Sequence, residues 1–302
     1  MKAKTILGFL FRLLVLSILY GILFIAGSMF VSGLLPETKS EPGLVSPGAG
    51  LLLVSIICTL VIMLLILSSR WSGWKLAFLL AFAWYGAITL IMQIETWYFL
   101  SAITVDAKLL PRLFIMGLPV AFVFVPLAVW IMGKGRSRPG EPAVVNLKMP
   151  LNQWIWKLGI IAITYVALYW CAGYFIAWQN PALRSFYGSP GDILPFWQHT
   201  AYTLKADPGL LPFQVMRAML WTLFAIPVIA GSKLDVWKTA LLVGVFLSLP
   251  QNLGHIVENP LIPIASVRLS HFIETASSTF LFGVIMTMVL LHRPKKEGAN
   301  LV

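Results

Sequence analysis

Residues 50–68 read GLLLVSIICTLVIMLLILS, a stretch without a single charged side chain. About 20 apolar residues in a helix cross the hydrocarbon core of a bilayer. A helix on the surface of a soluble protein would show a polar face at every turn, and this stretch has none. It therefore predicts a membrane-spanning helix.

Seven further apolar runs flank this stretch and account for most of the chain. The composition agrees, because 59% of the residues are hydrophobic, 11% are charged and the mean hydropathy is +0.87. Soluble domains carry about 25% charged residues, so a soluble, disordered or disulfide-framework protein is excluded. The sequence predicts an all-α polytopic membrane protein with about eight transmembrane helices. The other runs are 6–31, 75–100, 111–132, 154–178, 213–231, 237–257 and 267–291.

The two cysteines lie inside apolar runs and form no spaced pair. Cys58 belongs to the second run and Cys171 to the fifth. This spacing does not suggest a disulfide framework or a zinc ribbon. We expect both to be small buried side chains.

The basic residues that give the net charge of +11 are distributed unevenly between the two sides of the membrane. With the N-terminus in the cytoplasm, 15 of the 22 basic residues fall in inner segments and seven in outer ones. Lysine and arginine collect on the cytoplasmic side of membrane proteins. The bias predicts both termini in the cytoplasm, so the charge needs no nucleic-acid partner. Because little of the chain lies outside the runs, we expect a plasma membrane, by default the bacterial inner membrane.

The sequence also matches itself at two offsets. A shift of 163 places Ser69–Arg70 on Ser232–Lys233, Trp74–Lys75 on Trp237–Lys238 and Glu95 on Glu258. A shift of 145 places Arg12, Tyr20 and Phe30 on Lys157, Tyr165 and Phe175. These matches predict two parallel tandem four-helix repeats related by an axis along the membrane normal. Residues 1–150 form the first half with its cytoplasmic linker, and residues 151–302 form the second half with most of the polar site.

Ionisable residues gather at the predicted outer ends of the runs. Such groups are costly at bilayer depth and are functional candidates. The inner parts 76–88, 239–247 and 279–291 contain almost none. The pattern predicts an outward-facing site on one side of the membrane. Its members are Glu95, Arg217, Asn252, His255, Glu258, Arg268, His271 and Glu274.

A divalent metal ion is one interpretation of these residues. His255 with Glu258, and His271 with Glu274, are each spaced i, i+3 and so share a helix face. Together with Glu95 they supply two histidines and three glutamates, a donor set similar to that of bundle di-metal proteins. The order within each pair is reversed, however, and a fourth span-borne acid is missing.

Metal-free chemistry is the other functional interpretation. A histidine oriented by a glutamate is a general base, which makes the same five residues catalytic candidates. Arg217, Arg268, Arg184 and Asn252 are the candidates for binding an anionic substrate. The structural alternative is that Glu95–Arg217 and Glu258–Arg268 only neutralise one another.

The longest outer loop, residues 179–212, is rich in proline, glycine and aromatic residues. It is either a lid over the polar site or a loop that rests on the membrane interface. The Gly188–Gly191 turn lacks the Lys-Ser/Thr of a phosphate-binding loop.

These features favour a membrane-embedded enzyme that acts at the outer leaflet on an amphipathic, anionic substrate, a lipid or lipid-linked molecule. A transporter or channel for a small solute or ion is the first alternative, although such proteins place their polar site near the midplane. A membrane binding or assembly subunit is the second.

Overall fold

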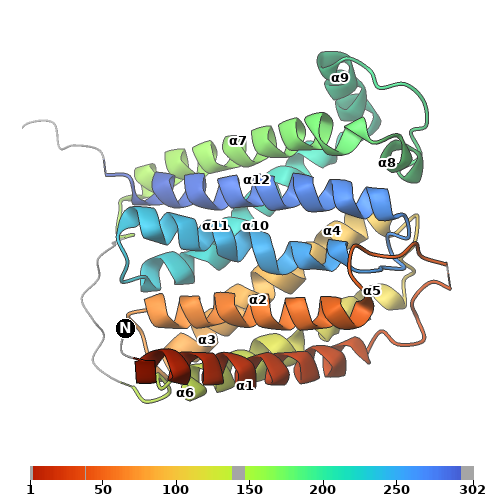
Figure 1. Ribbon diagram of the computed structural model, residues 1–302. Coiled ribbons are helices and arrows are strands. Elements are labelled where there is room, and N and C mark those ends of the chain that lie inside the picture. Colours follow the sequence, from red (N-terminus) through yellow and green to blue (C-terminus); the bar gives the residue numbers. More distant parts are fainter. Residues whose placement is uncertain (1–2, 38, 138–146, 294–302) are drawn as a thin grey trace, which may run out of the picture.

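A computed structural model describes residues 3–37, 39–137 and 147–293 as a bundle of helices (Figure 1). Within these ranges, eight helical segments are long and apolar enough to cross a membrane, which confirms the predicted number. The protein is therefore a multi-pass membrane protein. The spans are Ile6–Ser28, Pro47–Ser68, Gly73–Leu100, Leu109–Ile131, Leu151–Gln179, Leu210–Gly231, Val236–Ile256 and Ala265–Leu291.

Each half contributes four of the spans. The first half contains α1 (Ala3–Ser28), α2 (Pro47–Ser68), α3 (Gly73–Trp84), η1 (Tyr85–Leu90), α4 (Ile91–Leu100), α5 (Leu109–Met116), η2 (Val120–Phe124) and α6 (Val125–Ile131). The second half contains α7 (Leu151–Phe175), η3 (Ala177–Gln179), α8 (Pro181–Phe186), α9 (Phe196–Ala206), α10 (Leu210–Gly231), α11 (Val236–Asn252), η4 (Leu253–Ile256) and α12 (Ala265–Leu291).

Local signals set several helix boundaries. Ser46 caps α2 through the Ala49 amide, and a proline occupies the first helical position. Asp235 caps α11 through the Lys238 amide. The elements η1 and η2 are π-helical turns inside the third and fourth spans, a form that occurs often at functional sites.

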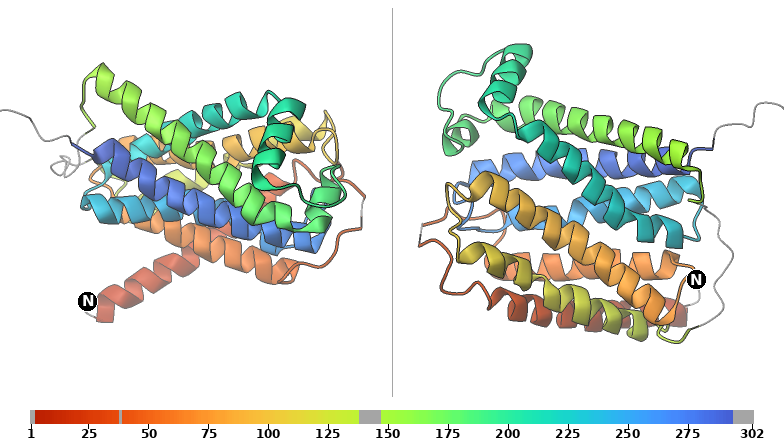
Figure 2. Two further views of the ribbon diagram at one scale, coloured as in Figure 1. Left: turned by 90° about the horizontal axis from the view of Figure 1, so that it is seen from above. Right: turned by 180° about the vertical axis from the view of Figure 1, so that it is seen from behind.

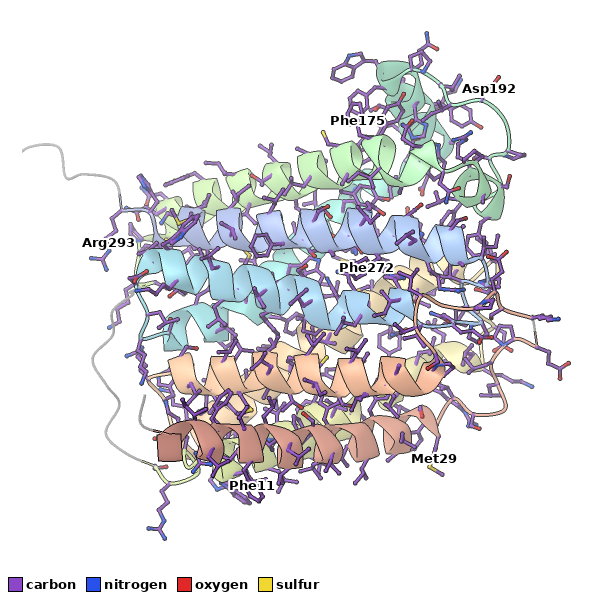
Figure 3. All side chains as sticks on the ribbon, viewed as in Figure 1. Phe11, Met29, Phe175, Asp192, Phe272 and Arg293 are labelled. Carbon is purple, nitrogen blue, oxygen red and sulfur yellow. The ribbon has the colours of Figure 1, made fainter. Side chains whose placement is uncertain are left out.

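The bundle has two distinct ends (Figures 1 and 2). The helices α8 and α9 lie at one end, which we call the α8–α9 end, and the N-terminus lies at the other. Figure 3 places Asp192 at the α8–α9 end and Arg293 at the opposite end. Lys2, Arg138, Lys295 and Lys296, which contribute to the predicted charge bias, lie outside the described residues. The cytoplasmic position of the termini stays a prediction.

The two halves meet in a matched way. Helix α10 packs on α3, and α11 packs on α2. At the end opposite α8–α9, the Arg70 amide donates to the Gly231 carbonyl at 2.8 Å and the Lys233 amide donates to the Ser68 carbonyl at 2.9 Å. Together these two hydrogen bonds form an antiparallel β-bridge between Ser69 and Ser232. A shift of 163 residues exchanges the two bonds, as a two-fold axis through this bridge would. The tandem repeat itself stays a prediction.

The buried core and the exposed apolar surface are both extensive. Trp84 and Trp221 are among the largest fully buried side chains, whereas Leu7 of α1 is 71% exposed and Ile163 of α7 is 72% exposed. The exposed apolar side chains suit contact with lipid. Cys58 is buried as expected, but Cys171 is exposed on α7, so that expectation was wrong for Cys171. Run length alone does not reveal which side of a span faces its neighbours.

Candidate functional site

An ion pair between the halves forms the first part of the site. Arg217 of α10 binds the Glu95 carboxylate of α4, and its second terminal nitrogen donates to Gln214 Oε1 at 3.0 Å. Arg217 is 4% exposed and the Glu95 side chain is 22% exposed. Each group offsets the cost of burying the other, and loss of either partner would leave an uncompensated charge.

Aromatic side chains form a platform beside this ion pair. The Arg217 guanidinium carbon lies 5.7 Å from the Tyr165 ring centroid, within the range of a cation–π contact. The Tyr165 hydroxyl accepts a hydrogen bond from the Trp221 indole at 3.3 Å. Both rings are buried, so they exclude water from one side of the guanidinium.

A hydrogen-bonded chain centred on His271 forms the second part. Its Nδ1 atom lies 3.2 Å from Glu274 Oε2, one turn further along α12. Its Nε2 atom lies 3.0 Å from the hydroxyl of Tyr187, the residue that follows α8. The chain therefore runs from a carboxylate through an imidazole to a phenol, which is a proton-relay arrangement.

The tautomer of His271 sets the direction of these hydrogen bonds. Burial raises the pKa of the Tyr187 phenol well above its ordinary value, and the negative charges of Glu95 and Glu274 raise it further, so the phenol keeps its proton at neutral pH. With the imidazole proton on Nδ1, His271 donates to Glu274 and its Nε2 accepts from the Tyr187 hydroxyl.

The ion pair and the histidine chain belong to one cluster. Glu274 and His271 both lie close enough to Glu95 to interact with it electrostatically. Tyr169 of α7 interacts with Glu274, Arg217 and Glu95. Two carboxyl groups, those of Glu95 and Glu274, therefore lie near the single guanidinium of Arg217.

The cluster also has unused hydrogen-bonding capacity. The His255 ring centroid lies 5.9 Å from that of His271, and His255 Nδ1 is buried without a partner. Gln214 Nε2 and Arg217 Nε are likewise buried and unpartnered in the described part of the chain. Buried polar atoms are nearly always hydrogen-bonded. These three atoms leave hydrogen-bonding capacity for a ligand or water.

The structure does not support Arg268 as an anion-binding residue. The guanidinium is 1% exposed, and it donates to four carbonyl oxygens at 2.7 to 3.0 Å. It therefore ties the loop before α12 to the loop before α2, and no terminal nitrogen is left for a substrate. The carbonyls belong to Glu41, Pro42, Ile262 and Pro263.

Arg184 and Asn252 also bind the protein itself. Arg184 donates to the carbonyls of Trp178 at 2.7 Å and Gly191 at 3.1 Å, and so shapes the loop around α8. Asn252 is fully buried, donates to the Ser248 carbonyl at 2.8 Å and accepts from Thr275 of α12. Both side chains are thus bound to the scaffold, and their predicted role in binding a substrate stays a prediction.

The predicted five-ligand metal centre is not assembled. Glu258 is exposed in the loop after η4, because the helix ends before it and Pro260 follows. Glu95 and Glu274 are engaged by Arg217 and His271. Within the described residues, no group of three histidine, cysteine or acidic side chains is placed to hold a metal ion.

The structure brings together Glu95, Arg217, His255, His271 and Glu274, and adds residues that sequence reasoning missed. Gln214 could have been found, because it lies one turn before Arg217. Tyr165 was noticed only as a repeat match. Tyr187 is one of five phenylalanine, tyrosine and tryptophan residues in its loop, and nothing in the sequence distinguishes it. No family model matches the chain, and comparisons with curated proteins and with solved structures also gave no match.

Proposed function

We propose that the protein is a membrane-embedded enzyme that uses acid–base chemistry on an amphipathic substrate. The observation that carries this proposal is the Glu274–His271–Tyr187 chain beside the Glu95–Arg217 pair. Paired carboxylate and imidazole groups are the usual means by which enzymes accept and return a proton at neutral pH.

In this mechanism His271 is the general base. A substrate hydroxyl that replaces the Tyr187 phenol on Nε2 gives its proton to His271, and Glu274 stabilises the imidazolium that forms. His255, whose Nδ1 has no partner among the described residues, is free to hydrogen-bond the head group, and the Glu95–Arg217 pair borders the site. Return of the proton from Nε2 to the product or leaving group closes the cycle.

The partners of the arginine side chains limit the kind of head group that the substrate can carry. Two of the three arginines first expected to hold an anion bind backbone carbonyls, and Arg217 is already neutralised by Glu95. A head group with hydroxyl or amide groups therefore fits better than a fully anionic one. The apolar part of the substrate would lie against the exposed apolar sides of the spans.

The proposed orientation places the α8–α9 end outside the cytoplasm, so the enzyme takes its substrate from the outer leaflet. The charge bias along the sequence supports this orientation. The tandem repeat is part of the same proposal, and the exchangeable pair of hydrogen bonds at Ser69 and Ser232 supports it.

The test compares membrane lipids from cells that produce the wild-type chain or single variants. Mass spectrometry should detect a lipid change with wild type that His271→Ala, Glu274→Gln and Tyr187→Phe each reduce. Loss of the base should cost at least about 100-fold in activity. Arg112→Ala, an exposed change in the first half, is the matched control and should leave the change intact.

Two outcomes would contradict this proposal. If well-expressed His271→Ala and Glu274→Gln variants both retain the full lipid change, His271 is not the general base. Stoichiometric metal in chelator-free wild-type protein, lost in a His255→Ala/His271→Ala double variant, would instead make the cluster a metal centre.

A transporter is the second candidate, and the π-helical turns η1 and η2 favour it. Irregular helices inside spans are common in transporters, where unwound backbone lines the pathway. This function requires a water-filled route to the end opposite α8–α9. Thr287 is fully buried in that part of α12. Labelling of a Thr287→Cys variant by a membrane-impermeant thiol reagent would favour transport over the enzyme.

A further inference from the structure

We propose that α9 is an interfacial helix that lies on the bilayer at the α8–α9 end and anchors the loop 180–209 to lipid. The proposal concerns the surface of this loop and does not depend on the chemistry of the His271 cluster. Its partner is the head-group region of the membrane.

The side chains of α9 are exposed to an unusual degree. The structure describes every residue of α9, and none of them is buried. Trp197 is 78% exposed and Tyr202 is 62% exposed. Tryptophan and tyrosine are enriched where a membrane meets water, because their rings are apolar and their edges carry a hydrogen-bonding group.

The start of α9 is fixed to the end of a membrane span. Phe196 stacks on Phe175 of α7 with ring centroids 5.3 Å apart, and the Tyr174 hydroxyl donates to the Leu194 carbonyl at 2.7 Å. These contacts hold α9 at the level where α7 ends (Figure 3). An element held at that level meets the membrane interface.

The direction of α9 agrees with this position. Figures 1 and 2 show that it runs across the direction of the spans and projects sideways from the bundle. Phe175 of α7, on which Phe196 stacks, is itself 60% exposed. The exposed aromatic surface of α9 thus adjoins an exposed apolar side chain of α7.

The charge of α9 is compatible with contact with lipid head groups. Residues 196–206 contain one lysine, Lys205, one histidine and no acidic residue. The helix itself thus carries no negative charge that would oppose contact with lipid head groups, and Asp207 follows only at its end. A second copy of the chain or a soluble partner is the competing occupant of this surface, and the experiment below distinguishes them.

The experiment uses nitroxide spin labels on the full chain in nanodiscs of phosphatidylcholine and phosphatidylglycerol. Separate Trp197→Cys and Tyr202→Cys variants carry the label in a Cys171→Ala background, since buried Cys58 is shielded. Label on the native, exposed Cys171 gives the in-bilayer reference, and label at Asp192→Cys gives the aqueous reference. Power saturation compares access of oxygen with access of a water-soluble nickel chelate.

We expect labels at 197 and 202 to show several-fold less access to the nickel chelate than the label at 192, with oxygen access close to that at 171. Access to nickel equal to that at 192 would show that α9 lies in water and would overturn the proposal. Loss of access to both relaxants, with an immobilised spectrum, would show a protein partner and would also overturn it. A failed His271→Ala test would leave these outcomes unchanged, so the two proposals can fail separately.

Discussion

Two of the contacts between the halves occupy matched positions in the sequence, and one of these two contains an ion pair. Where α4 of the first half meets α10 of the second, Glu95 pairs with Arg217. The positions matched to these residues by the shift of 163 are Glu258, which is exposed, and Val54. There α2 meets η4, and Gly50 packs closely on the Val257 side chain.

The uncharged contact shows that the bundle can join its halves without a buried ion pair. A glycine against a valine gives close packing of the kind that holds helices together in lipid. The pair at the other contact carries the cost of burying two charges. The proposed chemistry of the cluster would give Glu95 and Arg217 a role beyond joining the halves.

The same contrast appears around two matched tyrosines. Tyr20 packs edge-to-face on Phe124 with centroids 5.2 Å apart, and Tyr165 packs edge-to-face on Phe282 at 4.8 Å. The Tyr20 hydroxyl contacts the Cys58 thiol, whereas the Tyr165 hydroxyl accepts from Trp221. Cys58 and Trp221 are again 163 residues apart. Each tyrosine packs on a phenylalanine of the fourth span of its half, and Tyr165 also lies beside the Arg217 guanidinium.

The largest expected loss of stability follows from a change at the charged contact. Arg217→Ala should lower the free energy of unfolding by about 3 kcal/mol, because the buried Glu95 carboxylate loses its partner. The matched change Val54→Ala should cost about 1 kcal/mol or less. Unfolding of detergent-solubilised protein by sodium dodecyl sulfate measures both. A Glu95→Leu/Arg217→Leu double variant should recover most of the loss, and equal effects at 217 and 54 would erase the contrast.

An intermediate effect is expected at the matched aromatic pairs. Phe124→Ala and Phe282→Ala should each cost about 2 kcal/mol, less than in a soluble core, because lipid solvates apolar groups and mainly the packing is lost. The same unfolding titration applies. Similar costs would support equivalent scaffolds in the two halves, whereas a difference above about 1 kcal/mol would count against the predicted repeat.

The smallest expected effect is the pH dependence of the stability of α9. This helix belongs to the second half, and the first half has no counterpart for it. His199 of α9 lies between Tyr174 and Trp178, and burial lowers its pKa below the ordinary value. The folded loop therefore favours the neutral imidazole. Its stability is complete above the unfolded pKa of about 6.5 and declines as the pH falls below that value.

Hydrogen exchange measures this effect directly. Amides of 196–206 should exchange faster at pH 5 than at pH 7 after correction for intrinsic rates, and His199→Gln should remove that difference. The first-half loop 101–108 is the internal control. A pH dependence that persists in His199→Gln would assign it to another group.

The sequence predicted the spans well and the site only in part. Eight apolar runs are recognisable because each must satisfy its backbone within one helix. Glu95 and Arg217 were recognisable because charge at bilayer depth is rare. The backbone contacts of Arg268 were missed because two of the carbonyls it binds lie in the loop before α2, more than 220 residues earlier in the chain. A pattern along one helix cannot reveal such partners, and the same applies to Tyr187 on His271.

The bridge between Ser69 and Ser232 has a consequence for biosynthesis. A ribosome adds about 5 to 20 residues per second, so the segment around Ser69 waits roughly 10 to 30 seconds for its partner strand to be made. During that interval the first four spans are inserted while the Arg70 amide and the Ser68 carbonyl remain bound to water. Closure of the bridge is therefore a late event that reports arrival of the sixth span, and a stalled chain that ends before residue 231 would lack it.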